Sequence, residues 1–320
     1  MAGEVWREYD AGGRALRLLE AGDGAGALGR RSWRGALEMC ALLAGAAGGG
    51  GGSVLGGLGG SRVLELGAGA GLAGLFAARH CGPASVTLTE RPHGALLSLL
   101  RRNAEAHASS SPPSACSHSP PGADHCRDIR VRMLDWRSAP GVDADALALM
   151  LSVGNDEREG EVEVESGGAG TPELVLDAQF DVVLASECVY SWEAALTLPC
   201  AVRAALAPGG RAVFLHIVRE VAVQETLLAG LRGEGLRVAV REGAAGEAAG
   251  AGAGADGSGM PGDVGRSGRF LLVLADRADA PAAAWPDPAG PDPAGGLRWL
   301  RDSDDLAAAA EGRPPGAGAP

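Results

Sequence analysis

Residues 62–82 read RVLELGAGAGLAGLFAARHCG, and this stretch decides the fold. The largely apolar run at 62–66 is typical of a strand, and the turn after it carries Gly67, Gly69 and Gly71. A segment of helical character follows. A glycine-rich turn between a strand and a helix lets the backbone approach a nucleotide-like ligand closely. Two ligands compete for this turn: a pyrophosphate-bridged dinucleotide and S-adenosylmethionine.

The rest of the chain alternates between strand and helix patterns, which implies a parallel sheet covered on both faces. No helix separates the last two strands, so they should pair as an antiparallel hairpin. The predicted fold is therefore α/β: a Rossmann-like, seven-stranded, mostly parallel sheet with a C-terminal antiparallel hairpin. We expect strands at 62–66, 85–90, 129–136, 180–187, within 208–218, at 236–240 and at 269–275, and helices at 29–44, 71–80, 93–107, 193–206 and 219–233.

Composition divides the 320 residues into three parts. Residues 1–60 are expected to hold a helix and a glycine-rich linker, and residues 61–276 the main domain. Residues 277–320 are expected to be a disordered tail, with a short helix from residue 297 as the alternative. The main domain carries low-complexity insertions at 108–126, 138–178 and 243–268.

Charge and cysteine usage exclude some partners. The net charge of -12 argues against a nucleic-acid partner, which needs a clustered basic surface. No apolar run approaches the ~18 residues of a membrane-spanning helix, so we expect no membrane partner. The six cysteines form no CxxC pair, which favours a reducing, intracellular environment. We expect a monomer in the cytoplasm, with the nucleus as a second location.

The position of the first glycine favours S-adenosylmethionine over a dinucleotide. A dinucleotide turn starts at the strand end, yet the literal GxGxxG match starts at Gly69, two residues late. Counted from Gly67, the third glycine position is Leu72. Glu65 lies near the carboxyl edge of the strand, where its carboxylate would repel a pyrophosphate and attract an ammonium or sulfonium. The alternative is an edge-strand glutamate that faces water.

Polar or aromatic residues end the next two strands. Glu90 lies close to the ~20-residue spacing at which an acid accepts hydrogen bonds from ribose hydroxyls, and it suits either ligand. Asp135 can accept from an adenine amino group, and Trp136 can stack on the purine. The alternative for Trp136 is a buried core position. Together the three strand ends predict a nucleoside site.

These motifs resemble the class I, seven-β-strand methyltransferases, and within them the protein lysine methyltransferases of methyltransferase family 16. The resemblance runs from about Trp33 to Ala275. It implies S-adenosylmethionine as the cofactor and a lysine of another protein as the methyl acceptor. The motifs that carry it are SWRGAL (32–37), LELGAGAGLAGL (64–75), TLTE (87–90), MLDW (133–136), FDVVLASECVY (180–190) and LAPGGRAVFLH (206–216).

The resemblance also implies roles for single residues. Glu187 and Tyr190 match an acidic-x-x-aromatic motif, although many members have Asp in the first position. Glu187 would orient the acceptor and Tyr190 would contact its amine; alternatively, Glu187 binds the donor's ammonium and Tyr190 packs beside the sheet. The expected donor-binding residues, from the resemblance and the strand-end argument together, are Trp33, Glu65, Gly67, Ala68, Gly69, Gly71, Glu90, Asp135, Trp136 and Ser186.

Other functions stay open at this point. The acceptor could be a histidine or a small-molecule amine, and the chain could be a donor-binding scaffold without turnover. The interpretation as a dehydrogenase rests only on the literal GxGxxG match that starts at Gly69. We expect no metal, because Cys116-x-His118 and His125-Cys126 lack regular ligand spacing.

Overall fold

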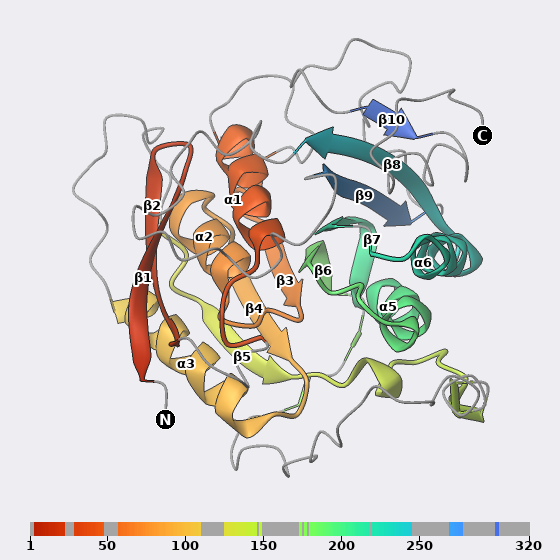
Figure 1. Cartoon of the computed structure of the whole chain (residues 1–320), viewed down its shortest axis with the longest axis horizontal. Coiled ribbons are helices and arrows are strands. Elements are labelled where there is room, and N and C mark those ends of the chain that lie inside the picture. Colours follow the sequence, from red (N-terminus) through yellow and green to blue (C-terminus); the bar gives the residue numbers. More distant parts are fainter. Residues whose placement is uncertain are drawn as a thin grey trace.

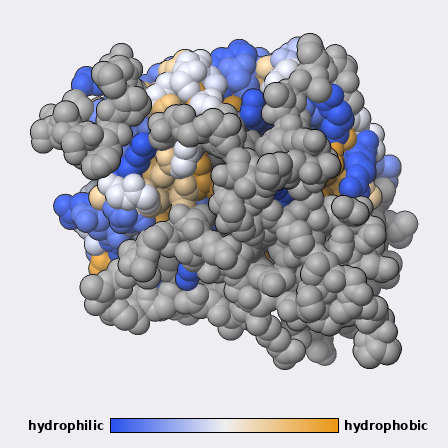
Figure 2. All heavy atoms as spheres, turned by 90° about the horizontal axis from the view of Figure 1, so that it is seen from above, coloured by the Kyte–Doolittle hydropathy of each residue, from blue (hydrophilic) through white to orange (hydrophobic). Residues whose placement is uncertain are grey.

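The computed structural model describes residues 3–22, 29–47, 57–109, 125–145, 147–148, 173–174, 176–177, 179–217, 219–244, 269–277 and 298–300. Among these residues no helix is long and apolar enough to cross a membrane. The described side chains on the face seen from above are mainly hydrophilic, with a smaller hydrophobic area beside them (Figure 2).

A twisted sheet forms the centre of the molecule (Figure 1). Its strands are β3 (Arg62–Leu66), β4 (Ser85–Glu90), β5 (Ile129–Met133), β6 (Phe180–Ser186), β7 (Leu206–His216), β8 (Leu236–Ala244), β9 (Arg269–Arg277) and β10 (Arg298–Leu300). The spatial order is β10-β8-β9-β7-β6-β3-β4-β5. Strands β3 to β7 pair in parallel, and β9 joins β7 and β8 antiparallel. The seven predicted strands and the antiparallel ending are confirmed.

Helices cover both faces of this sheet. Helices α1 (Arg34–Ala47), α2 (Leu72–His80) and α3 (Gly94–Ser109) lie on one face, and α5 (Trp192–Ala205) and α6 (Val221–Gly233) on the other (Figure 1). Strand β3 shows why both faces are needed. Val63 packs into the core under α1 to α3, whereas Leu64 packs into the core under α5 and α6. Side chains alternate along a strand, so a strand buried on both faces needs apolar residues in both directions.

The sequence did not predict a hairpin near the N-terminus. Strands β1 (Glu4–Ala11) and β2 (Arg14–Ala21) pair antiparallel across Gly12 and Gly13, whose φ angles are 62° and 74°. Two residues with positive φ suit the tight turn of a two-residue hairpin. Leu16 and Leu18 face the helical layer and are buried. The expectation of only a helix and linker over residues 1–60 is therefore wrong for this segment.

Two smaller differences concern boundaries. Helix α1 begins at Arg34, not at residue 29, so Trp33 precedes the helix. Strand β10 pairs antiparallel with β8 within the segment expected to be a disordered tail, and it is a strand where the alternative was a helix. The three expected insertions fall largely outside the described residues.

Candidate active site

A cavity of about 220 Å³ lies where the carboxyl ends of the parallel strands meet the segment before α1. Ligands of open α/β sheets bind at this edge, where the strand order reverses between β3 and β6. Most of the residues predicted for the site come together in its wall. They are Trp33, Gly67, Ala68, Gly69, Glu90, Trp136, Ser186, Glu187 and Tyr190.

The glycine turn forms the floor of the cavity and requires its glycines. Gly67 and Gly69 adopt φ angles of 60° and 56°, which side chains rarely tolerate. A Cβ at Gly67 would lie 2.8 Å from Sγ of Cys188, and one at Gly69 would lie 2.8 Å from the carbonyl oxygen of Gly29. The glycines therefore let the turn pack closely against Cys188 and Gly29 while both residues still line the cavity.

Glu90 ties the end of β4 to the glycine turn. Its Oε2 accepts a hydrogen bond from the N–H of Gly69 at 2.9 Å, and its Oε1 accepts from the N–H of Arg91 at 2.9 Å. The carboxyl is buried, and burial raises its pKa. Each carboxylate oxygen has a second lone pair, so Glu90 can still accept from a hydroxyl in the cavity.

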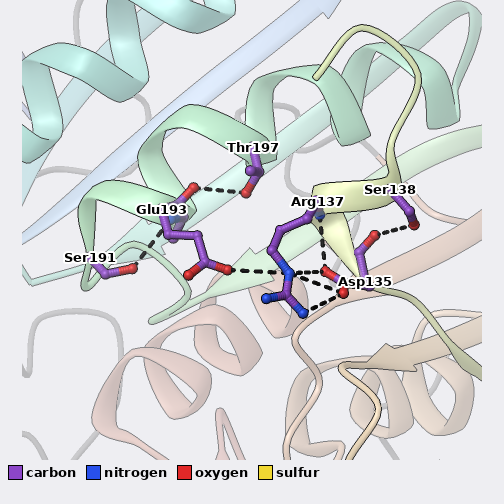
Figure 3. Close-up of polar contacts among 7 residues, drawn as sticks. Asp135, Arg137, Ser138, Ser191, Glu193 and Thr197 are labelled. Carbon is purple, nitrogen blue, oxygen red and sulfur yellow. Dashed lines mark hydrogen bonds and ion pairs between the residues drawn. The ribbon is translucent and has the colours of Figure 1, made fainter. Parts of the chain in front are cut away.

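Strand β5 ends at Met133 and not at residue 136 as expected, so Asp135 and Trp136 follow the strand, and they play different parts. The Trp136 ring lies in the cavity wall, and a Cβ at Gly67 would be 3.2 Å from it. Asp135 does not line the cavity. Its carboxylate accepts from the N–H of Arg137 at 3.0 Å and forms an ion pair with that side chain, which also lies 3.7 Å from Glu193 of α5 (Figure 3). Asp135 thus helps to connect the 3-10 turn η1 (Trp136–Ser138) with α5.

Glu65 and Gly71 do not line the cavity. Glu65 is 1% exposed, and its Oε2 accepts a hydrogen bond from the N–H of Gly74 at 2.9 Å, in the first turn of α2. Burial raises the pKa of this carboxyl to about 8. Gly71 precedes α2 with φ 93°, packed against Leu100. Contrary to the sequence-based expectation, neither residue lines the cavity; Glu65 instead holds the start of α2.

Glu187 combines strain, burial and charge. Among the described residues, Glu187 is the non-glycine residue with a positive φ, which is 54°. This left-handed backbone conformation costs about 1 kcal/mol or more. The N–H of Glu187 donates to the carbonyl of Leu215 at 2.9 Å, which anchors the strained backbone to β7. Burial raises the pKa of the carboxyl, and Arg219 opposes that shift.

Arg219 was not predicted from the sequence. Its Nη2 lies 3.2 Å from Oε2 of Glu187, and its guanidinium lies 5.5 Å above the ring of Trp33 as a cation–π contact. All three side chains line the cavity, and Tyr190 lies at its rim, 52% exposed. The only signal in the sequence is that Arg219 follows β7, whose carboxyl end reaches the same edge of the sheet.

Cys188, which lines the cavity, and His216 are both buried. The Cys188 Sγ donates to the carbonyl of Leu66 at 3.0 Å, and burial raises its pKa well above the ordinary value, so it stays a thiol. His216 is 1% exposed and contacts Gln224, and burial lowers its pKa to about 4. No group of three metal-binding side chains occurs in the described ranges, and Cys116 and His118 lie outside them.

The N-terminal hairpin supports the cavity wall. The buried carboxylate of Glu20 in β2 accepts from the N–H of Ser32 at 2.8 Å and from the hydroxyl of Tyr9 at 2.8 Å. Ser32 lines the cavity one residue before Trp33. Asn103 of α3 connects the same hairpin to the glycine turn, because its Nδ2 donates to the carbonyls of Leu19 and Ala70, both at 2.9 Å.

Fold and site together resemble those of the class I S-adenosylmethionine-dependent methyltransferases. The glycine turn after β3, the buried acid that ends β4 and the antiparallel strand β9 inserted beside β7 agree with this class. Residues 13–140 match the family model Methyltransf_16, described as lysine methyltransferase, and this match confirms the resemblance drawn from the motifs. No curated protein matches the chain significantly.

Solved structures with similar folds include several methyltransferases. TYW2 of M. jannaschii in complex with AdoMet is 12% identical (TM-score 0.42, 86% of each chain), and precorrin-6y C5,15-methyltransferase of Geobacter metallireducens is 12% identical (TM-score 0.39, 75% of this chain and 86% of that one). The [4+2]-cyclase SpnF is 16% identical (TM-score 0.35). The match covers 56% of this chain and 52% of the cyclase, so this chain spans about half of the length of that protein.

Proposed function

We propose that this methyltransferase transfers a methyl group to a lysine side chain of another protein. The observation that carries the proposal is Glu187: a buried carboxylate, held in a strained conformation, in the wall of the cavity that the glycine turn also lines. Tyr190, three residues later, lies at the rim of the same cavity. The lysine methyltransferase description of the matching family model supports the same acceptor.

The cavity has the features that the donor requires. Gly67 and Gly69 line the cavity and carry no side chains of their own, Glu90 has acceptor capacity for ribose hydroxyls, and the Trp136 ring offers a face or edge to the adenine. We propose that these residues hold the cofactor. When bound, S-adenosylmethionine supplies an electrophilic methyl group on its sulfonium.

The residues on the acceptor side would position and desolvate the amine. A free lysine has a pKa of about 10.4, so its ammonium must lose a proton before the nitrogen can attack. A buried carboxylate attracts the ammonium and orients it, and a confined site disfavours the charged amine through desolvation. We propose that Glu187 orients the nitrogen and that the Tyr190 hydroxyl contacts it at the rim. Positioning of this kind supplies a large part of the rate in a displacement reaction.

The test is methyl transfer from labelled S-adenosylmethionine to proteins of a cell lysate, followed by acid hydrolysis and amino-acid analysis. The chain contains no lysine, so labelled methyl-lysine cannot come from the enzyme itself. Glu187→Gln should reduce labelled methyl-lysine at least a hundredfold while S-adenosylhomocysteine still binds in calorimetry. Glu193→Gln, in the first turn of α5 and outside the cavity wall, is the matched control and should retain full transfer. Label recovered in methyl-histidine instead would overturn the proposed acceptor.

A further inference from the structure

We propose that Arg219 is a gate on the acceptor side: its guanidinium occupies the cation position beside Glu187, and a cationic acceptor must displace it. This inference rests on the proposed function, in which Glu187 orients an amine. It adds a residue that determines which acceptors enter and how tightly they bind.

The contacts of Arg219 place it across the acceptor side of the cavity. The residue lies between the end of β7 and the start of α6, and its side chain reaches Glu187 at the end of β6 at 3.2 Å. It also covers the ring of Trp33, just before α1, at 5.5 Å. One side chain thus joins three segments that are distant in sequence, and it does so inside the cavity wall.

The charges around the cavity disfavour a further cation while Arg219 stays. Three arginines line the cavity, Arg31, Arg91 and Arg219, against the two carboxylates of Glu90 and Glu187. The Glu90 carboxylate already accepts two backbone hydrogen bonds. An incoming ammonium beside Glu187 would therefore meet the Arg219 guanidinium at close range, where like charges repel strongly in a partly desolvated site.

Arg219 can leave this position. Its side chain is 38% exposed, whereas that of Glu187 is 3% exposed. A half-exposed ion pair and a half-exposed cation–π contact together correspond to roughly a tenfold change in a binding constant. This is large enough to discriminate between acceptors and small enough for a well-matched substrate to overcome.

The experiment titrates n-butylammonium, the cation that mimics a lysine side chain, into the full chain saturated with S-adenosylhomocysteine. We expect Arg219→Ala to bind this probe about tenfold more tightly than the wild type. Arg219→Lys should remain close to the wild type because it keeps the cation. Arg137→Ala, which removes an exposed arginine outside the cavity, should leave the affinity unchanged. Adding Glu187→Gln to Arg219→Ala should abolish the gain.

Several outcomes would overturn the gate. Equal affinity for n-butylammonium in the wild type and Arg219→Ala would do so, and so would the absence of binding in every variant. A tenfold loss of S-adenosylhomocysteine affinity in Arg219→Ala would assign the guanidinium to the donor instead. Arg219→Gln provides a second variant if the alanine lowers the melting temperature. The methyl-lysine assay on the wild type tests the proposed function independently, because its readout does not require Arg219 to be changed.

Discussion

Replacing Glu65 with glutamine separates a supporting role from a ligand-binding role. In the structure the Glu65 carboxyl accepts a hydrogen bond from Gly74 in the first turn of α2 and is almost completely buried. Glutamine keeps an acceptor oxygen of nearly the same shape but has no ionisable proton. Glu65→Gln should therefore preserve the contact with Gly74 and remove only the ability to ionise.

The magnitude follows from the pKa of Glu65, which burial raises from 4.5 to about 8. Between these two pH values the native state keeps a proton that the unfolded state releases, so stability falls as pH rises. The slope is about 1.4 kcal/mol per pH unit, and the full effect across the window is about 4 to 5 kcal/mol. Below pH 4.5 both states hold the proton, and this contribution to the pH dependence vanishes.

The assay is urea unfolding of both proteins from pH 4.5 to pH 8.5. Because all other titrating groups are common to both, the difference between the two stabilities isolates Glu65. We expect equal stability near pH 4.5 and a more stable Glu65→Gln variant by several kcal/mol at pH 8. A difference that does not change with pH would refute the burial argument. A tenfold loss of S-adenosylhomocysteine affinity in the variant would instead return Glu65 to the donor site.

Three further predictions test the parts around the site. Gly67→Ala puts a Cβ 2.8 Å from Sγ of Cys188 at a φ of 60°, so the glycine turn should shift. Calorimetry should then show at least a roughly tenfold loss of S-adenosylhomocysteine affinity, and wild-type affinity would mean that the turn does not need a glycine here. Tyr9→Phe removes a hydrogen bond to the buried carboxylate of Glu20, so urea unfolding should show a loss of about 1.5–3 kcal/mol, and a loss near zero would mean that this contact does not anchor the hairpin. Arg137→Ala breaks an exposed ion pair, so it should cost less than about 1 kcal/mol, with the cost shrinking in high salt; a larger loss that is insensitive to salt would show that the pair is effectively buried.

The sequence predicted the sheet well because its signals are local. The apolar run before Gly67 and the acid at Glu90 each report on one strand end, and parallel strands bring such ends to one edge. The seven predicted strands and their ligand-binding edge therefore followed from short patterns, and nine residues of the cavity wall followed from these patterns and the family resemblance together.

Glu65 shows what local patterns do not decide. Alternation along β3 puts Val63 and Glu65 on the same face, the one that α2 covers. A ligand role requires the side chain to leave the sheet at its edge, but this face is closed by the helix. Sequence gives the alternation but not which helix lies over which face.

Arg219 and the N-terminal hairpin were missed for different reasons. Arg219 depends on the reach of one long side chain from the β7–α6 connection to Glu187, which no periodicity encodes. The hairpin did have a signal, since Gly12 and Gly13 stand between two segments with alternating apolar residues. Its many charged residues obscured this alternation.

The strained backbone of Glu187 places the stability of the fold in opposition to the role that we propose for its side chain. Glycine adopts the left-handed conformation at this position without strain. The substitution would also remove a buried carboxylate from the cavity wall and break its ion pair with Arg219. Selection of variants for heat resistance alone would therefore favour glycine at this position. Such variants would lose the carboxylate that we propose orients the acceptor. Engineering of this chain should hold residue 187 fixed and seek its gains elsewhere.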